Sequence, residues 1–288
     1  MKKSSVLAVA LARRLPRGYW RVASFAAKRD TDLQHLRLPL RYVPDKYLVA
    51  DLRQSVFMPL LREGQFAHQH GEDLLFMRLL KEGDVVFDVG ASIGYTPLLF
   101  AELVGANGEV LAFEPSPKSF QLLVASTEST PVISCMNVAL SDQTGSLQFY
   151  ESPSLDLSSL ETLPGVRPIT VEVSTLDDVA STTGSEPSFV KIDVEGHESA
   201  VFRGMTETLG GPNPPVVIFE SLSREARHRD IATLEELTKV PFSIHRISRY
   251  GGMVELDSMK GTSNYVMLPD NQRWRIAIVD GGRSSDEP

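Results

Sequence analysis

Short apolar runs alternate with amphipathic stretches along most of the chain after residue 84. Five runs rich in β-branched and aromatic residues predict buried strands, at 85–89, 109–113, 132–138, 189–193 and 215–220. Stretches with apolar residues at helical spacing follow four of them, at 93–104, 117–128, 197–209 and 223–238. Because a connecting helix leaves successive strands parallel, this order predicts an α/β fold with a mainly parallel sheet and right-handed crossovers.

The pattern changes in two places. Residues 145–150 and 169–173 form strands outside this alternation, and a Ser- and Pro-rich loop at 151–168 separates them. A loop of this length in a compact domain predicts a functional flap or a substrate wall. Near the end of the chain, strands at 242–247 and 264–268 flank a hairpin segment near 253–257 without an intervening helix, so we expect an antiparallel final pair.

Residues 1–65 carry no strong motif, and the first thirty of them are basic. Their apolar run at 6–12 is far too short to span a bilayer, and we expect no transmembrane segment. The basic flanks favour an amphipathic helix that packs on the domain or makes a weak contact with a membrane surface. We predict an N-terminal helical extension at 1–65, the α/β domain at 66–280 and a disordered polar tail at 281–288.

Composition narrows the classes of function. The chain has 288 residues, of which 42% are hydrophobic and 23% charged, as expected of a globular protein. The net charge of −8 argues against nonspecific binding of nucleic acid, which needs a basic surface. The single cysteine, Cys135, excludes an intramolecular disulfide and a zinc site built from cysteines.

The central motif is the strand, Gly-rich turn and helix at 85–104. Its spacing is D-x-G-x-x-x-G, from Asp88 through Gly90 to Gly94, and not the G-x-G-x-x-G of dinucleotide sites. A carboxylate at Asp88 would repel a pyrophosphate and would suit a ligand with an ammonium group. S-adenosylmethionine carries such a group, a sulfonium and no phosphate. Glu114 closes the next strand, where an acid can accept both hydrogen bonds of a ribose diol.

Acidic residues stand at the carboxyl ends of four predicted strands: Asp88, Glu114, Asp193 and Glu220. That edge of an open α/β sheet forms the ligand crevice. Asp193, Glu195 and Glu220 together offer oxygen ligands for Mg²⁺ or Ca²⁺. Asp193 is equally suited to take a proton from a substrate hydroxyl. His197 is equally compatible with a structural role and with the role of a base.

Two histidines, His68 and His70, precede the amphipathic stretch 74–80, which we expect to pack as a helix beside the first core strand. Their spacing would suit a metal site on a strand. Because the sequence shows no third ligand nearby, we interpret them as histidines of the surface or of a pocket rim.

Five segments together resemble the FkbM-type S-adenosylmethionine-dependent methyltransferases: 87–96, 113–115, 137–142, 175–177 and 190–198. The last, Val-Lys-Ile-Asp-Val-Glu-Gly-His-Glu, is specific, whereas many methyltransferases share the D-x-G-x-x-x-G turn. The resemblance covers about residues 70–270. It implies a Rossmann-like class I methyltransferase fold, in which a seven-stranded sheet, mostly parallel with one antiparallel strand, has helices on both faces.

The resemblance also implies roles for individual residues. The expected contacts of the cofactor come from the Gly-rich turn, the end of the next strand and a segment near the adenine: Asp88, Gly90, Ala91, Gly94, Tyr95, Glu114, Pro115, Ser116, Asn137, Val138 and Ala139. A functional role is implied for the 193–198 segment. The candidate catalytic residues are Asp193, Glu195, His197 and Glu220, and the candidate Mg²⁺ ligands are Asp193, Glu195 and Glu220.

The expected activity is methyl transfer to a hydroxyl oxygen of a small-molecule, saccharide or natural-product acceptor, in the cytoplasm. Two alternatives stay open. A protein that binds S-adenosylmethionine without catalysis would have no need of the acid cluster. A nicotinamide-dependent oxidoreductase would need the third glycine, which this turn lacks.

Overall fold

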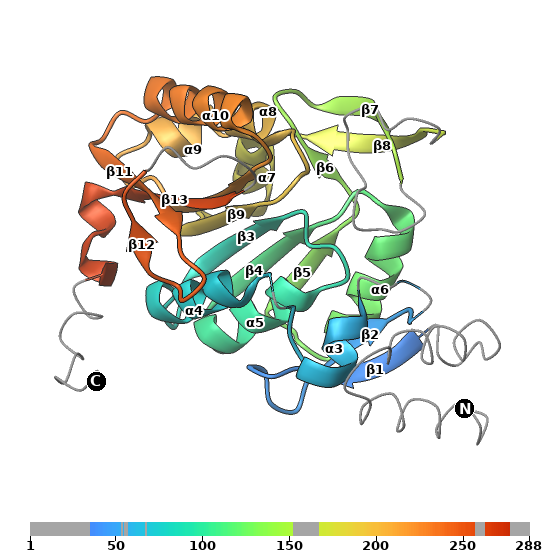
Figure 1. The fold of residues 1–288 in the computed structure, drawn as a ribbon. Coiled ribbons are helices and arrows are strands. Elements are labelled where there is room, and N and C mark those ends of the chain that lie inside the picture. Colours follow the sequence, from blue (N-terminus) through green and yellow to red (C-terminus); the bar gives the residue numbers. More distant parts are fainter. Residues whose placement is uncertain are drawn as a thin grey trace, which may run out of the picture.

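The computed structural model describes residues 35–52, 54, 57–66, 68–151, 167–256 and 263–276. In these residues eight strands form one central sheet, in the order β12-β11-β13-β10-β9-β3-β4-β5 (Figure 1). The five consecutive strands that end at the β5 edge are parallel: β10 (Val216–Ser221), β9 (Phe189–Ile192), β3 (Val85–Val89), β4 (Glu109–Phe113) and β5 (Ile133–Met136). The predicted core strands and their parallel arrangement are therefore confirmed.

At the other edge of the sheet, the strands from the end of the chain pair antiparallel with their neighbours, as expected. Strand β13 (Ser263–Pro269) pairs antiparallel with both β10 and β11 (Phe242–Ile247). The expected sheet of seven strands is one strand short of the observed eight. The additional strand is β12 (Met253–Val254), which pairs antiparallel with β11 at the edge of the sheet. A tight turn produces it: Gly251 adopts φ +71°, and the N–H of Ser248 donates to the carbonyl of Gly252.

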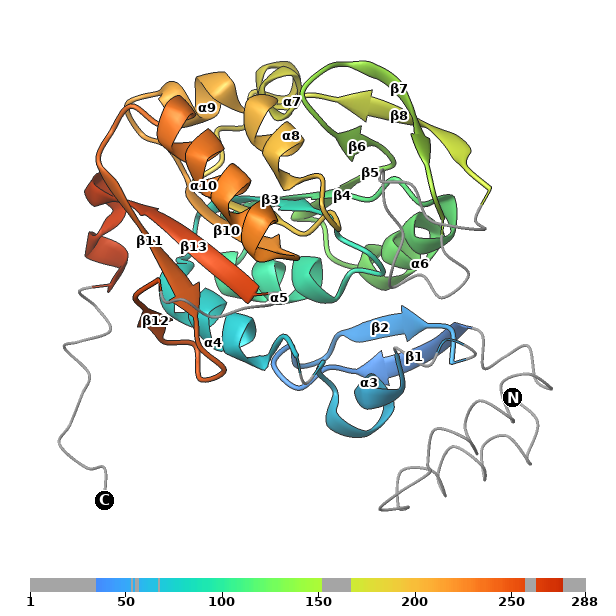
Figure 2. The same ribbon diagram turned by 45° about the horizontal axis from the view of Figure 1, so that its top comes forward.

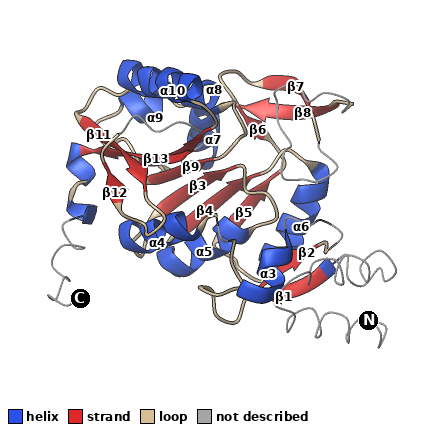
Figure 3. Ribbon diagram, viewed as in Figure 1, coloured by secondary structure: helices blue, strands red, loops and turns tan. Residues whose placement is uncertain are grey.

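Helices cover both faces of the sheet (Figures 2 and 3). On one face lie α4 (His70–Leu79), α5 (Tyr95–Val104) and α6 (Pro117–Thr127). On the other lie α7 (Leu176–Thr183), α8 (Glu198–Arg203), α9 (Thr206–Gly210) and α10 (Arg224–Leu237). Because side chains alternate along a strand, Val86 packs in the first of these cores and Phe87 in the second.

The single helix predicted over 197–209 is wrong, since α8 and α9 are separate helices. Gly204 marks the break. A Cβ at this position would lie 1.9 Å from the carbonyl oxygen of Ser141, so only glycine allows the two backbones to approach this closely. Its N–H still closes α8 by donating to the carbonyl of Ala200.

The helical extension predicted for residues 1–65 is wrong for its described part, which begins with a β-hairpin. Strands β1 (Leu36–Pro39) and β2 (Tyr47–Ala50) pair antiparallel, and the short helix α3 (Met58–Glu63) follows. Leu38 and Leu48 are fully buried in the same core as α4 and α5, and the N–H of Val49 donates to Ser126 on α6. Burial of these leucines against the domain stabilises a hairpin that two four-residue strands could not sustain alone.

A second, small sheet lies next to the main one (Figure 1). It joins β6 (Ala139–Leu140), β8 (Ile169–Ser174) and β7 (Gly145–Phe149) around its own small apolar cluster. The extension up to residue 34, most of the loop predicted at 151–168 and the tail at 281–288 lie outside the described residues. Among the described helices, none has the length and apolar character that crossing a membrane requires.

Candidate active site

The Gly-rich turn after β3 lies directly against the end of β9. Gly90 has φ +86°, and the N–H groups of Gly90 and Ala91 both donate to the carbonyl of Phe113 at the end of β4. A Cβ at Gly90 would lie 1.9 Å from the carbonyl oxygen of Asp193. Gly94, with φ +98°, then starts α5. The two glycines of the motif therefore serve a strained, closely packed turn between three strand ends.

Beneath this turn, a buried lysine links two of the predicted acids. The Nζ atom of Lys191 lies 3.6 Å from Oδ1 of Asp88 and 3.2 Å from Oδ2 of Asp193. Asp88 is fully buried and also accepts a hydrogen bond from the hydroxyl of Thr96 at 2.6 Å. Burial raises the pKa of Asp88, and the charge of Lys191 opposes that rise. Burial would lower the pKa of Lys191, but the carboxylates of Asp193, Asp88 and Glu72 raise it, so this lysine stays charged.

Glu114 is held by backbone groups on both of its oxygens. Its Oε2 atom accepts from the N–H of Ser92, and its Oε1 atom accepts from the N–H of Ser116, each at 2.8 Å. Burial raises the pKa of Glu114 to about 8, although both hydrogen bonds favour the charged form. Each carboxylate oxygen keeps a second acceptor position, so a ribose diol can still donate to it.

A cavity opens above the turn and unites residues from distant parts of the chain. Its lining includes seven of the residues predicted to contact the cofactor: Gly90, Ala91, Tyr95, Glu114, Pro115, Val138 and Ala139. Lys191, Asp193 and Glu195 line it as well. Aromatic and polar side chains from the segment before α4 also belong to the lining: Phe57, Phe66, His68 and Gln69.

Other predicted residues act around the cavity and not within its lining. Asp88 lies under the turn, and Ser116 caps α6 by accepting from the N–H of Ser119. The side chain of Asn137 donates to the carbonyls of Glu114 and Pro115, at 2.7 and 3.1 Å, and so holds the end of β4.

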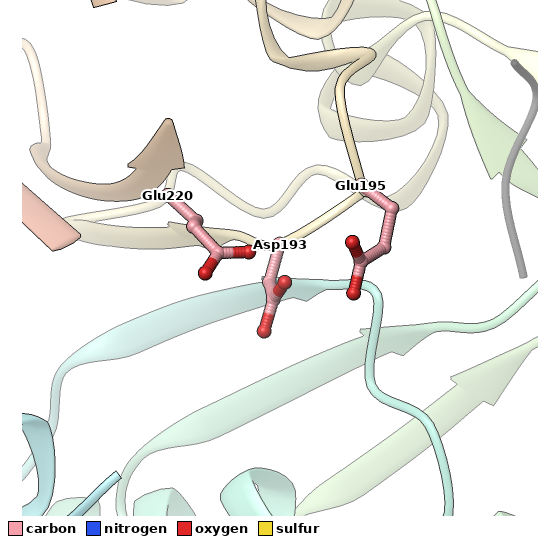
Figure 4. A group of neighbouring side chains, drawn as sticks. All are labelled: Asp193, Glu195 and Glu220. Atoms are coloured by element: carbon pink, nitrogen blue, oxygen red, sulfur yellow. The ribbon is translucent and has the colours of Figure 1, made fainter. Parts of the chain in front are cut away.

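Three acids lie close together (Figure 4), of which Asp193 and Glu195 line the cavity and Glu220 does not. Asp193 follows β9, Glu195 lies in the loop after it, and Glu220 belongs to β10. Each offers a carboxylate oxygen within 4.8 Å of the others. Burial raises the pKa of Glu220 to about 7, and the nearby charges of Asp193 and Glu195 add to this rise. Glu195 itself adopts φ +54°, a strained conformation for a residue with a side chain.

His197, the remaining candidate base, is separate from this group. It precedes α8, and its Nε2 atom lies 2.9 Å from the hydroxyl oxygen of Ser141. It is not part of the cavity lining in the described structure. The geometry therefore favours the structural interpretation of His197 over the role of a base.

Several residues at or near the site were not among the predicted catalytic and cofactor residues. Lys191 lines the cavity, and so does His68, in agreement with the interpretation of this histidine as a residue of the surface or of a pocket rim. Glu72 and Asp73 lie nearby on α4. Burial raises the pKa of Glu72 to about 8 and that of Asp73 to about 7. Glu72 accepts from the amide of Asn264, and Asp73 accepts from the hydroxyl of Tyr95 at 2.7 Å. In the sequence, Glu72 and Asp73 look like ordinary acidic residues in the first turn of a helix. Lys191 could have been found, because a lysine within an apolar strand is unusual.

The strand order, the D-x-G-x-x-x-G turn at the end of β3 and the buried acid at the end of β4 define a class I S-adenosylmethionine-dependent methyltransferase. The sequence profile of the family described as "Methyltransferase FkbM domain" matches residues 88–240. The chain therefore belongs to the FkbM methyltransferase family, and the resemblance deduced from its motifs is confirmed.

Three characterised relatives are similar to this chain. Hexuronic acid methyltransferase AglP of Haloferax volcanii is 27% identical over 217 residues, which cover 74% of this chain and 81% of that protein. The 2-O-methyltransferase NoeI of Sinorhizobium fredii is 28% identical over 149 residues, 46% of this chain and 61% of that protein. The 31-O-demethyl-FK506 methyltransferase FkbM of Streptomyces tacrolimicus is 42% identical over 79 residues, 26% of this chain and 30% of that protein.

Proposed function

We propose that this enzyme methylates a hydroxyl oxygen of a saccharide or another small-molecule acceptor. One observation carries the proposal: a single cavity joins the Gly-rich cofactor turn to the carboxylates of Asp193 and Glu195. Residues from the segment before α4 line the same cavity, and we expect them to contact the acceptor. The names of AglP and NoeI, a hexuronic acid methyltransferase and a 2-O-methyltransferase, support an acceptor of this class.

The residues around the turn fit S-adenosylmethionine. Glu114 accepts hydrogen bonds from the ribose hydroxyls, and the absent side chain of Gly90 lets the backbone of Asp193 pack against the cofactor turn. Val138 and Ala139 give an apolar surface for the adenine. Asp88 and Asp193 share the single cation of Lys191, and this excess of carboxylates at the turn favours a cationic ligand over a phosphate. When bound, S-adenosylmethionine supplies a methyl group that is activated by its sulfonium.

The acceptor site is formed by two walls. Phe57 and Phe66 offer apolar faces of the kind on which sugar rings pack, while His68 and Gln69 add polar groups. Opposite them, the carboxylate of Asp193 orients the acceptor hydroxyl, and Lys191 holds that carboxylate in place. Such positioning supplies much of the rate in a transfer that requires an in-line approach.

A divalent cation is a second candidate component of this site. The three carboxylates of Asp193, Glu195 and Glu220 offer the hard oxygen ligands that Mg²⁺ prefers, and they are close enough to share one ion. We expect EDTA to abolish turnover and Mg²⁺ to restore it if the ion is required. Full turnover in EDTA would leave the three acids to act without a metal.

The test is release of S-adenosylhomocysteine with a hexuronate glycoside, a neutral hexoside and a polyketide alcohol as acceptors, with each product located by mass spectrometry. We expect one of the acceptors to gain a single O-methyl group. Tight binding of S-adenosylmethionine in calorimetry without turnover on any acceptor would favour the catalytically inactive alternative. Displacement of the bound cofactor by NADH would favour the oxidoreductase.

A further inference from the structure

His68 enters the active-site cavity from a part of the chain far from the methyltransferase motifs. It lies just before α4 and lines the cavity together with Asp193, Lys191 and Glu195. The charges of Asp193 and Lys191 both act on its imidazole. The residue is exposed to solvent. A molecule bound in this cavity therefore has both the imidazole of His68 and the carboxylate of Asp193 among the groups that surround it.

The ring of His68 is held in place without using its nitrogens. Phe66 packs against it with ring centroids 5.5 Å apart, and Tyr95 in turn packs edge-on against Phe66 at 5.2 Å. Within the described part of the chain, no residue forms a hydrogen bond with either nitrogen of His68. By contrast, the neighbouring His70 contacts the hydroxyl of Tyr42, and His197 contacts that of Ser141. His68 thus packs on Phe66 and keeps its nitrogens available to a ligand.

We propose that His68 is a catalytic residue that accepts the proton of the acceptor hydroxyl, an inference that rests on the proposed function. The acceptor oxygen forms its bond to the methyl carbon while the bond between that carbon and sulfur breaks. The electron pair of the broken bond stays on sulfur, which becomes a neutral thioether. The hydroxyl proton passes to a free imidazole nitrogen of His68, and the resulting imidazolium later loses it to water.

The acid–base chemistry of the two side chains favours His68 as the base and Asp193 as the group that orients the acceptor hydroxyl. An aspartate carboxylate ordinarily binds a proton only well below neutral pH, whereas an imidazole does so near pH 6.5. A base works best when its proton affinity matches the working pH. Desolvation lowers the pKa of His68, Lys191 lowers it further, and Asp193 opposes both, so the imidazole is neutral at physiological pH.

The first experiment compares His68→Gln with His70→Gln, using the best acceptor of the panel described above. The glutamine at 68 keeps polar atoms but cannot take the proton. We expect kcat to fall by roughly 10²- to 10⁴-fold, the usual size of a general-base contribution, with the affinity for S-adenosylmethionine unchanged in calorimetry. His70→Gln should stay within about threefold of the wild type. A raised KM with unchanged kcat in His68→Gln would reduce His68 to a wall residue and overturn the inference.

Two further measurements separate a base from a structural residue. In His68→Ala, added imidazole should restore part of kcat. The pH–rate profile of this variant should also lack the acidic limb that the wild-type profile shows. In the protein without cofactor, imidazole ¹⁵N NMR should show that Asp193→Asn moves the titration of His68 to lower pH, because a negative charge has been removed. Absence of imidazole rescue together with an unchanged pH profile would overturn the inference.

Failure of the role of His68 can be distinguished from failure of the proposed methyl transfer. A wild-type enzyme that turns over none of the acceptors overturns the proposed function and this inference with it. An active wild type with an equally active His68→Gln variant leaves the proposed function intact and removes only the role of His68.

Discussion

Gly90 and Asp193 lie in backbone contact, although about a hundred residues of chain separate them: a Cβ on Gly90 would be 1.9 Å from the carbonyl oxygen of Asp193. The contact joins the end of β3 to the end of β9, which are neighbours in the sheet. It therefore brings the cofactor turn and the acid cluster into one rigid unit. A side chain at position 90 must therefore displace either the cofactor turn or the acid cluster.

We predict that Gly90→Ala weakens both stability and cofactor binding. Alanine at φ +86° costs about 1–3 kcal/mol in backbone strain, and the contact with Asp193 adds to that cost. Gly83→Ala is the matched control, because Gly83 has φ +84° with no atom within 4 Å of the added Cβ. Urea unfolding and calorimetry with S-adenosylmethionine measure the two effects. Equal losses in the two variants would mean that the contact with Asp193 is unimportant.

Glu114→Ala is expected to weaken S-adenosylmethionine binding by about 1–3 kcal/mol, since it leaves the polar groups around the ribose unpaired. Glu114→Gln should lose less, because an amide oxygen still accepts one hydrogen bond. Glu109→Ala is the control, because Glu109 begins the same strand at the opposite end, where it accepts from Ser185. Wild-type affinity in a folded Glu114→Ala variant would remove Glu114 from the cofactor site.

Lys191→Met is expected to destabilise the fold by about 3–5 kcal/mol, the usual cost of leaving buried charges without their partner. The carboxylates of Asp88 and Asp193 would then face each other without the intervening cation. Adding Asp88→Asn to Lys191→Met should restore part of the free energy of unfolding. Denaturant melts of the single and double variants measure the coupling, and strictly additive losses would show that Asp88 and Lys191 do not act as a pair.

The core of the fold was predictable because its signals are local. Each of the five core strands is an apolar run bounded by turn residues, and each predicted acid falls at or next to a strand end. The hairpin β1–β2 was not predictable, since two four-residue strands are too short to show a period and β2 is held by a distant contact, the hydrogen bond from Val49 to Ser126 on α6. The break at Gly204 likewise depends on the distant backbone of Ser141.

The same distinction applies to the site. Asp193, Glu195 and Glu220 meet as expected because parallel strands bring their carboxyl ends together. His68 and Glu72 reach the same region through the packing of the segment before the sheet, and no spacing along the chain encodes that contact. His197 shares a motif with Asp193, but the start of α8 turns it toward Ser141.

Asp193→Asn is expected to lower kcat by roughly 10²-fold, the usual loss when a reacting group is misplaced, while cofactor affinity changes far less. The amide keeps the shape of the side chain but loses the charge that orients the acceptor and attracts the cation of Lys191. Asp142→Asn is a control on the surface, where Asp142 lies 3.9 Å from Arg203. Steady-state kinetics and calorimetry separate the two effects. Near-wild-type turnover would place the reaction centre elsewhere in the cavity.

Glu72→Gln tests the pH dependence that the buried acids impose. Burial raises the pKa of Glu72 from an ordinary value of 4.5 to about 8, so the folded state holds a proton that the unfolded state releases. The stabilisation from this group is therefore complete below pH 4.5 and is lost as the pH rises through about 8. Glutamine mimics the protonated form at every pH. We expect the variant to match the wild type near pH 5 and to exceed its free energy of unfolding by at least about 1 kcal/mol near pH 9.

Glu63→Gln, which changes an exposed glutamate at the end of α3, controls for the change of net charge. Parallel stability curves for wild type and Glu72→Gln from pH 5 to 9 would show that Glu72 is ionised throughout and that its neighbours, Lys191 above all, outweigh its burial.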